Sequence, residues 1–157
     1  MPLHLRPISD EETGSFLAYV KDAYTREIAT HAGMSEEEAR AKAERDFSLL
    51  VCDGRPVAGQ QLFWVEKGET NERIGRVWLG EREAGQPVGV LYDIEIGSAF
   101  RGRGLGRQLM LLIEEEARRR GFTEIRLNVF GGNEIARSLY RSLGYAEFAI
   151  AMRKRLS

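Results

Sequence analysis

Arg101-Gly102-Arg103-Gly104-Leu105-Gly106 lies between a run with the alternation of a strand and a run with the periodicity of a helix. The strand-like run is Val90 to Ile96, and the helix-like run extends from Leu105 to Arg120. Three alternate glycines let the backbone turn tightly and bring several N–H groups to one point, and the helix adds the positive end of its dipole. The stretch therefore predicts a binding site for phosphate groups.

Two familiar phosphate-binding loops do not fit these residues. A dinucleotide-binding fingerprint needs the spacing G-x-G-x-x-G, whereas Arg107 stands where the third glycine would be. A P-loop needs Gly-Lys-Ser or Gly-Lys-Thr at the start of the helix, and this helix begins Leu105-Gly106-Arg107. The pattern that fits is Arg-x-x-Gly-x-Gly between a strand and a helix.

Composition and charge exclude several classes of protein. A chain of 157 residues, 43% hydrophobic and 30% charged, is typical of one soluble domain, spanning residues 1–157. The formal net charge of −1 argues against a nucleic-acid partner, since such proteins carry an excess of Lys and Arg. Cys52 is the single cysteine, and His4 and His31 lack the spacing of metal ligands, so no metal is expected. Without a signal peptide or a membrane-spanning run, we expect a cytoplasmic protein with no membrane partner.

The first half of the chain predicts a strand, two helices and a meander of strands. Leu3 to Ile8 is a short strand candidate, and capping boxes at Ser9 and Ser35 begin two amphipathic helices. From Gln60 onward the period is that of strands, and short polar links between the strands imply antiparallel pairing. The segment from Leu49 to Ala58 fits either a loop or an edge strand. The three predicted strands are Gln61 to Val65, Ile74 to Leu79 and Val88 to Ile96.

The second half predicts a parallel crossover and a final strand. The helix after the glycine loop ends at Gly121, and Thr123 to Phe130 alternates as a strand, which requires a parallel connection. Asn133 then caps a helix that Gly144 ends. Tyr145 to Met152 alternates again and predicts a last strand.

A second segment supports the glycine loop. Asn133-Glu134-Ile135-Ala136-Arg137-Ser138-Leu139-Tyr140-Arg141-Ser142-Leu143-Gly144-Tyr145 is similar to the segment N-x-x-A-x-x-L-Y-x-x-x-G-F/Y of the GCN5-related N-acetyltransferases (GNAT). The pattern at Arg101 resembles the pyrophosphate loop with which this family binds acetyl coenzyme A. Two independent patterns, in the right order on the right elements, extend the resemblance over nearly the whole chain. The resemblance implies the acyl-CoA N-acyltransferase fold, an α/β fold with a mixed sheet and the order β-α-α-β-β-β-α-β-α-β.

The resemblance also implies roles for particular residues. Members of the family hold an acetyl thioester beside a neutral amine, which attacks the carbonyl directly. By correspondence, the backbone of Ile94, Glu95 and Ile96 receives the pantetheine arm, with an N–H near Ile96 as the oxyanion donor. Tyr140 matches the tyrosine that protonates the sulfur, and Asn133 matches the asparagine that contacts pantetheine. The pyrophosphate would meet Arg101, Gly102, Arg103, Gly104, Leu105, Gly106 and Arg107.

Each of these side chains has a structural alternative. Asn133 would serve equally as a plain helix cap. Tyr140 falls on the apolar stripe of its helix and would fit a core position with its hydroxyl satisfied. A glycine cluster before a helix is often only a tight turn, although interleaved arginines favour a phosphate site.

Asp93 and Glu95 are predicted to share one face of their strand, opposite Tyr92, Ile94 and Ile96. As catalytic residues, they would deprotonate an ammonium substrate through water or hold a cationic acceptor. The alternative is a polar face in contact with solvent.

The chain departs from the family at two positions. Some relatives, among them ribosomal-protein alanine acetyltransferases, carry a catalytic glutamate where Asn128 stands here, so any base must come from elsewhere. Members usually end with two strands after the tyrosine helix, whereas this chain has room for one. That leaves a sheet edge to be covered, and we hypothesise a homodimer.

The sequence thus predicts an acetyl-CoA-dependent N-acetyltransferase that acts on a primary amine of a small molecule or peptide in a ternary complex. The first two helices, including Tyr24, His31 and Glu38, would line the acceptor side. One rival function is a non-catalytic acyl-CoA-binding sensor or regulatory module. Another is a nucleotide-binding protein without enzyme activity.

Overall fold

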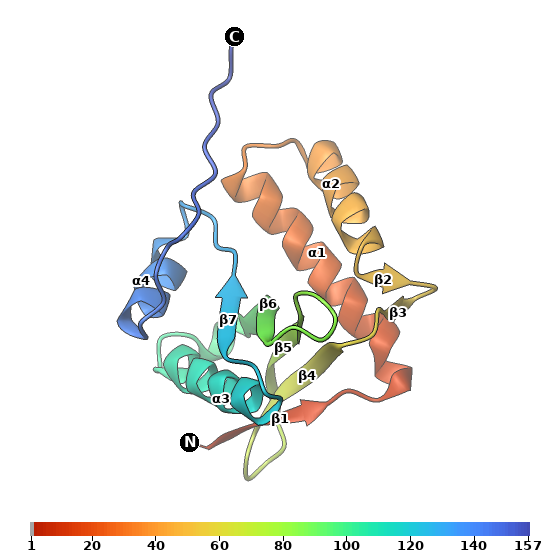
Figure 1. Cartoon of the computed structure of the whole chain (residues 1–157), viewed down its shortest axis with the longest axis vertical. Coiled ribbons are helices and arrows are strands. Elements are labelled where there is room, and N and C mark those ends of the chain that lie inside the picture. Colours follow the sequence, from red (N-terminus) through yellow and green to blue (C-terminus); the bar gives the residue numbers. More distant parts are fainter. Residues whose placement is uncertain (1) are drawn as a thin grey trace.

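The computed structural model describes residues 2–157, and in it a mixed sheet separates two layers of helices (Figure 1). The sheet has five strands in the order β1-β4-β5-β6-β7, and β2 and β3 form a separate two-stranded hairpin. All neighbours in the large sheet are antiparallel except β6 and β7, which are parallel. The predicted meander and parallel crossover are therefore confirmed. The strands are β1 (Leu3–Pro7), β2 (Val51–Cys52), β3 (Arg55–Pro56), β4 (Gln60–Lys67), β5 (Arg73–Glu81), β6 (Val88–Ile96) and β7 (Glu124–Leu127).

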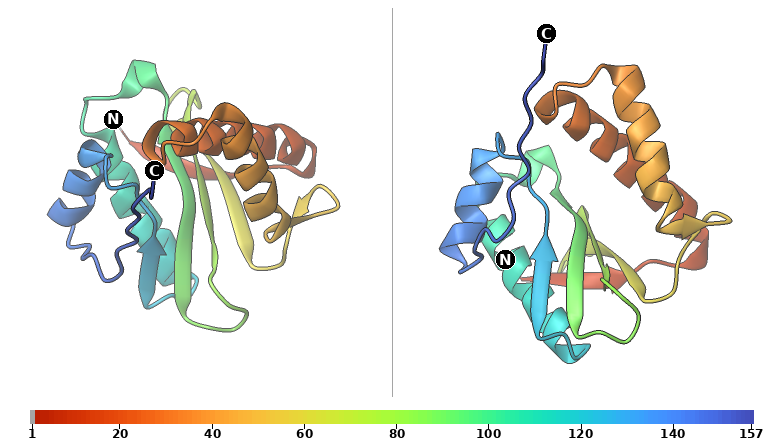
Figure 2. Two further views of the ribbon diagram at one scale, coloured as in Figure 1. Left: turned by 90° about the horizontal axis from the view of Figure 1, so that it is seen from above. Right: turned by 45° about the horizontal axis from the view of Figure 1, so that its top comes forward.

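The helices divide between the two faces of the sheet, with α1 and α2 on one face and α3 on the other, as the views in Figure 2 show. α4 lies beside α3 on the same side of the molecule. Among the described residues, no helix has the length and apolar character needed to cross a membrane. The helices are α1 (Thr13–His31), α2 (Glu36–Ser48), α3 (Leu105–Arg119) and α4 (Glu134–Ser142), with short 3-10 turns η1 (Asp10–Glu12) and η2 (Ser98–Phe100).

Strand alternation explains why both faces are covered. In β4, Phe63 and Val65 belong to the core under α3, whereas Leu62 and Trp64 pack with Phe16 of α1. Successive side chains of a strand point to opposite faces, so a strand that is apolar at every position needs a helical layer on each side. The run Leu62 to Val65 thus requires the layered arrangement that the structure shows.

Local signals in the sequence set the ends of the helices. Ser9 and Glu12 form both bonds of the predicted capping box, and the Ser35 hydroxyl accepts a hydrogen bond from the Glu38 backbone N–H at 3.1 Å. Gly121 follows α3 with φ at +86°, the conformation of a glycine cap. The uncertain segment from Leu49 to Ala58 is a small hairpin, turned by Asp53 and Gly54 with positive φ.

The last predicted strand is not formed. No residue from 143 to 157 is in a helix or strand, and the chain from Tyr145 to Met152 has no backbone ladder with another described residue. Its alternating apolar side chains are exposed: Phe148 by 73%, Ile150 by 71% and Met152 by 90%. Alternation shows that a segment would suit a sheet, but a strand also needs a neighbour to pair with.

Candidate active site

β6 carries a bulge at the point where it parts from β7. In the pairing with β5, the consecutive residues Trp78 and Leu79 face Asp93 and Leu91, which leaves Tyr92 as an extra residue in β6. β7 pairs only with Val88 to Leu91, so the half of β6 beyond the bulge has no partner strand on the β7 side. A bulge bends its strand and interrupts pairing. The backbone of Ile94, Glu95 and Ile96 therefore lies on an open edge, to which an extended arm with amide groups can bind as an added strand.

The bulge also corrects one predicted orientation. Ile94 and Ile96 share one face of β6, as predicted, and pack against the core under α3, but Tyr92 packs with Trp78 in the core under α1. The prediction that Tyr92 shares a face with Ile94 and Ile96 is wrong, because strict alternation holds only where no residue is inserted.

The glycine loop follows β6 and leads into α3. Gly102 and Gly104 have φ of +78° and +74°, and no heavy atom lies within 4 Å of the place that a Cβ would take at either glycine. Gly104 is the N-cap of α3, so no side chain caps the first turn and its N–H groups are available to an anion. Gly106 differs, because it lies inside α3 and an added Cβ would be 3.3 Å from Leu139 of α4. Two of the three glycines thus shape the loop, and the third lets two helices approach.

Basic side chains surround this loop. The Arg101 Nε donates to the Ile96 carbonyl at 2.9 Å, and its Nη2 lies 3.5 Å from Glu95 Oε1. Arg103 is exposed, and Arg107 Nη1 donates to the Ser142 hydroxyl of α4 at 3.2 Å. Leu105 is buried in the core, so only its backbone faces the loop. The structure brings the predicted pyrophosphate residues together beside the open edge of β6.

The two carboxylates of β6 share one arginine. Arg76 Nε donates to Asp93 Oδ2 at 2.8 Å, and Arg76 Nη2 donates to Glu95 Oε2 at 2.6 Å. Burial raises the pKa of Asp93 to about 6, although the positive charge of Arg76 and its hydrogen bond act in the opposite direction. The side chain of Asp93 is only 13% exposed, so it does not lie on a solvated face. Arg76 was not predicted as a site residue, because an arginine within a strand gives no sequence signal of its own.

Tyr140 and Asn133 come from α4 and the loop before it. The Asn133 side chain accepts a hydrogen bond from the Ala136 backbone N–H at 3.2 Å, so it does act as the helix cap. The Tyr140 ring contacts the Tyr145 ring at 5.8 Å, and its hydroxyl has no hydrogen-bond partner among residues 2–157. Burial raises the pKa of Tyr140, and the negative charges of Glu27 and Asp93 raise it further. Tyr140 therefore keeps its proton at neutral pH and has it free to donate.

Glu27 of α1 is a site residue that the sequence analysis missed. Burial raises the pKa of Glu27, an electrostatic interaction with His31 lowers it and one with Glu95 raises it again, which places Glu27 in the electrostatic field of the site. It forms no hydrogen bond or ion pair with another described residue. Glu27 lies three residues after Tyr24 and four before His31, which puts it on the same side of the helix as both. This spacing is the sequence feature that could have identified Glu27 as a site residue.

The three residues predicted to line the acceptor side do not lie together in the structure. The His31 ring stacks on Phe130, which follows β7, with ring centres 5.6 Å apart, and so links α1 to the far side of the opening between β6 and β7. The Tyr24 hydroxyl donates to Asp46 of α2 at 2.6 Å, and Glu38 is exposed on α2. Of the three, only His31 contacts a residue next to the opening.

A pocket of about 270 Å³ opens beside Glu95 on the α1 face of the sheet. Arg73 lines it with its guanidinium 4.0 Å from the ring centre of Trp64. The pocket combines aromatic walls with a carboxylate and two guanidinium groups. Its lining includes Tyr19, Trp64, Arg73, Arg76, Glu95 and Phe100.

Comparisons with known proteins agree with this geometry. Residues 16–145 match the profile of the Acetyltransferase (GNAT) family. The chain is 31% identical to the uncharacterized N-acetyltransferase YdgE of Bacillus subtilis, with 99% of each chain covered. It is 29% identical to the N-acetyltransferase YycN of the same organism, covering 99% of this chain and 100% of YycN.

Solved structures share the same fold. The crystal structure of YycN superposes with a TM-score of 0.88 at 27% identity, and 99% of each chain is covered. AAC(6′)-Iy, solved in complex with the bisubstrate analogue CoA-S-monomethyl-acetylneamine, superposes with a TM-score of 0.58 at 18% identity over 99% of each chain.

Proposed function

Because the chain belongs to the acetyltransferase (GNAT) family, we propose that it moves an acetyl group from acetyl coenzyme A to a primary amine by direct transfer in a ternary complex. It is an N-acetyltransferase, an enzyme of the acyltransferase class. The observation that carries the proposal is the open edge of β6, which runs from a pair of partly buried carboxylates to a glycine loop at an uncapped helix start.

The residues present fit a cosubstrate with a pyrophosphate and an extended amide arm. The space over Gly102 and Gly104 is free, and the N–H groups at the start of α3 suit phosphate oxygens. The open backbone of Ile94 to Ile96 suits the amides of the arm, and an N–H near Ile96 would meet the thioester oxygen. Arg101 already bonds the Ile96 carbonyl and would exchange this contact for phosphate. A solved structure with this fold holds an analogue built on coenzyme A.

The acceptor amine would approach from the α1 face. Asp93, Glu95 and Glu27 place negative charge there, which attracts an ammonium group and favours loss of its proton through water. Both oxygens of Asp93 contact Arg76, so Asp93 also holds Arg76 and Glu95 in position. The pocket beside Glu95 would take the rest of the acceptor molecule.

The reaction balances with these groups and solvent water. The amine nitrogen forms a bond to the acetyl carbon, and the carbon–sulfur bond breaks. An ammonium substrate first gives one proton to water, and the neutral amine loses a second toward the carboxylate side as it becomes the amide. The sulfur gains one proton from Tyr140, which regains it from solvent. The products are an N-acetylated amine and free coenzyme A.

Thiol release tests the proposal directly. Acetyl coenzyme A and a panel of primary amines, including amino acids, polyamines and short peptides, are incubated with the enzyme, and free thiol and acetylated product are both measured. The expected result is thiol release that requires an amine and matches the acetylated product one to one. Binding of coenzyme A without transfer to any amine would favour the sensor reading instead, in which only the glycine loop is functional.

A further inference from the structure

β5 carries a bulge near its start that places two arginines on the same face of the sheet. Two consecutive residues of β4 face Gly75 and Arg73, which leaves Ile74 as an extra residue in β5. On a regular strand, residues three positions apart point to opposite faces, and one inserted residue brings them to the same face. Arg73 lies over Trp64 in the core under α1, and Arg76 bonds the carboxylates of β6 on that same face. Both guanidinium groups therefore line the pocket of about 270 Å³ on the α1 side of the sheet.

The Arg73 side chain is an unpaired cation that lies over an aromatic ring. Its guanidinium carbon is 4.0 Å from the ring centre of Trp64, and it forms no hydrogen bond or ion pair with any other residue that the structure describes. Stacking occupies one face of the guanidinium and leaves the N–H groups at its edge, in the fork that matches a carboxylate. Trp64 is itself fixed, because its Nε1 donates to Glu12 at 2.8 Å and the residue is only 3% exposed. Arg73 thus presents a supported edge for an oxyanion.

The other cations near this pocket are already paired. Arg76 bonds both carboxylates of β6. The Lys67 Nζ, 4.9 Å from the ring centre of Phe100 in the pocket wall, lies 3.1 Å from Glu72 Oε2. An anion that enters the pocket would therefore bind Arg73.

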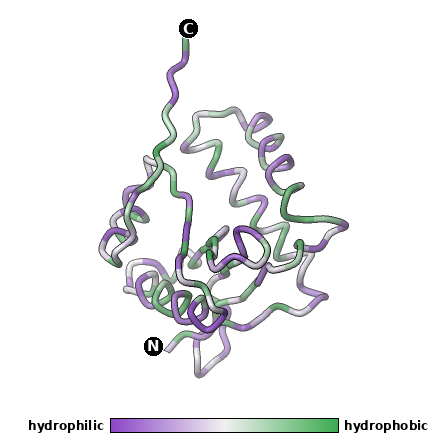
Figure 3. Tube along the Cα trace, in the orientation of Figure 1, coloured by the Kyte–Doolittle hydropathy of each residue, from purple (hydrophilic) through white to green (hydrophobic). Residues whose placement is uncertain are grey.

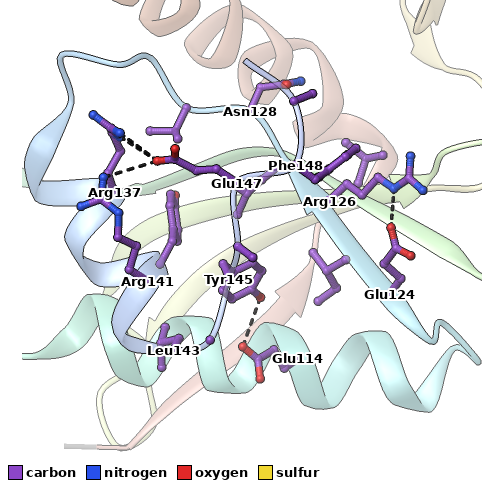
Figure 4. Close-up of a pocket in the computed structure, with 18 of the residues that line it drawn as sticks. Glu114, Glu124, Arg126, Asn128, Arg137, Arg141, Leu143, Tyr145, Glu147 and Phe148 are labelled. Atoms are coloured by element: carbon purple, nitrogen blue, oxygen red, sulfur yellow. Dashed lines mark hydrogen bonds and ion pairs between the residues drawn. The ribbon is translucent and has the colours of Figure 1, made fainter. Parts of the chain in front are cut away.

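A larger groove, of about 1250 Å³ beside β7, lacks such an unpaired charge. Each arginine that lines it is paired with a carboxylate. Figure 4 shows two of these pairs, Arg137 with Glu147 at 2.8 Å and Arg126 with Glu124. The smaller pocket therefore differs from the groove in having a free guanidinium beside the open edge of β6.

Aromatic side chains line the space between the charged groups of the smaller pocket. Hydrophobic and hydrophilic residues alternate along α1 and α2 (Figure 3), and Tyr19 of α1 is 53% exposed. Its ring centre lies 6.5 Å from that of Trp64, in an edge-on contact. Phe100 of η2 also lines the pocket. Such walls suit a chain of methylene groups between two charged ends of a ligand.

The anionic and cationic groups lie apart along β5. Arg73 is three residues before Arg76, which holds Glu95, and three residues of strand cover roughly 10 Å. An amine separated from its carboxylate by several atoms can span such a length. In an α-amino acid, by contrast, both groups share one carbon.

We propose that the acceptor is an amino carboxylate, whose amine lies beside Glu95 and whose carboxylate binds the edge of Arg73. This inference rests on the proposed acetyl transfer and narrows its acceptor to molecules in which several atoms separate the two groups. The bonds that form and break are those of the transfer described above. The carboxylate takes no part in them and serves only to bind and orient the acceptor.

Kinetics with matched pairs of amines test the inference on the wild-type enzyme. The molecules ε-aminocaproate and pentylamine have the same methylene chain and differ only in the carboxylate. Because a hydrogen bond to a charged group is worth more than a neutral one, kcat/KM is expected to be at least about tenfold higher for ε-aminocaproate. The corresponding advantage of glycine over methylamine should be smaller, since glycine cannot reach both ends of the pocket. Equal kcat/KM values for ε-aminocaproate and pentylamine would overturn the inference.

Variants of Arg73 assign the preference to this side chain. Arg73→Met removes the charge and keeps an apolar contact with Trp64, so the ratio of kcat/KM for ε-aminocaproate to that for pentylamine should fall to near one. Arg73→Lys keeps the charge but loses the fork, so it should retain only part of the ratio. Arg55→Met is the matched control, because Arg55 is exposed on β3 outside the pocket, and it should leave the ratio unchanged. A wild-type ratio in Arg73→Met would show that the carboxylate binds elsewhere.

Failure of this inference and failure of the proposed function give different results. Transfer to ε-aminocaproate and pentylamine at equal rates would retain the acetyltransferase and remove only the carboxylate site. Absence of transfer to every amine tested, while coenzyme A still binds, would overturn both.

Discussion

At the scale of single residues, two neighbouring tyrosines differ in what their hydroxyl groups contact. The Tyr145 hydroxyl is bound to Glu114, whereas the Tyr140 hydroxyl has no partner among the described residues and faces the negative side of the site. A proton donor needs a free hydroxyl within reach of the leaving group. We expect Tyr140→Phe to lower kcat about 100-fold or more, while the Kd for coenzyme A changes less than about twofold.

Tyr145→Phe is the matched control for this experiment, since it removes the same atom from the ring that contacts Tyr140. It should lower the melting temperature slightly and leave kcat near the wild-type value. If both variants lose kcat equally, the pair of rings has a packing role, and Tyr140 is not the proton donor.

Asp93 makes the pH dependence of the reaction predictable. Its pKa of about 6, raised by burial, means that it is ionised above pH 6 and neutral below. The ratio of kcat/KM for wild type to that for Asp93→Asn cancels the titration of the amine itself. This ratio is expected to fall as pH drops through about 6, by roughly tenfold per pH unit where the charge is lost. A ratio that stays constant from pH 5 to pH 8 would exclude a role for the Asp93 charge in turnover.

The same pKa shift has a consequence for stability. A carboxyl group with a raised pKa binds its proton more tightly in the folded state than in the unfolded state. Its contribution to the free energy of unfolding is therefore fully present below pH 4 and lost as pH rises through about 6. The ion pair with Arg76 limits this loss of stability. The fold therefore tolerates a carboxylate whose charged form is disfavoured by burial, at the place where the reaction is proposed to occur.

At the scale of elements, two glycines allow the effect of backbone strain to be distinguished from the effect on ligand binding. Gly104 and Gly85 have nearly the same φ, +74° and +77°, and an added Cβ meets no atom within 4 Å at either position. Alanine at either position should cost about 1–2 kcal/mol of stability, because the left-handed conformation is strained for it. Only Gly104→Ala puts a methyl group where the pyrophosphate is proposed to lie, so only it should weaken coenzyme A binding, by about tenfold or more.

Calorimetric titration of both glycine variants with coenzyme A compares their Kd values. Equal Kd values for coenzyme A in Gly104→Ala and Gly85→Ala would mean that phosphate does not contact the start of α3. The Gly85 control lies in the loop between β5 and β6, so it reports the effect of strain alone.

Elements with local signals were predictable, and features that depend on distant partners were not. Ser9 and Ser35 correctly predicted where the helical turns before α1 and in α2 begin, because the bonds of the Ser9 capping box and of the Ser35 cap join residues three positions apart. The bulge at Tyr92 was not predictable, since it exists only in the register of β6 against β5. Glu27 was missed for the same reason, because its significance comes from Glu95 and Tyr140, which lie far along the chain.

At the scale of the whole molecule, the proposed site depends on both helical layers. α1 supplies Glu27 from one face of the sheet, while α3 and α4 supply the loop and Tyr140 from the other. α1 reaches the opening between β6 and β7, where His31 stacks on Phe130 in the loop after β7. A cosubstrate in this opening would contact elements from residue 94 to residue 140, so binding should stabilise the fold as a unit.

Thermal unfolding in the presence of ligands tests whether binding stabilises the fold as a unit. A ligand that binds only the folded state adds about 2.7 kcal/mol at 100 times its Kd, and for a chain of this size each kcal/mol raises Tm by about 2–4 °C. Acetyl coenzyme A and coenzyme A are expected to raise Tm by roughly 5–10 °C in a single transition, because both carry the pyrophosphate and the arm. ATP, which has phosphates but no arm to pair with β6, should give a much smaller shift. Equal shifts with all three ligands would mean that the loop alone binds and that the open edge of β6 has no part, whereas two separate transitions would show that the helical layers do not unfold as one domain.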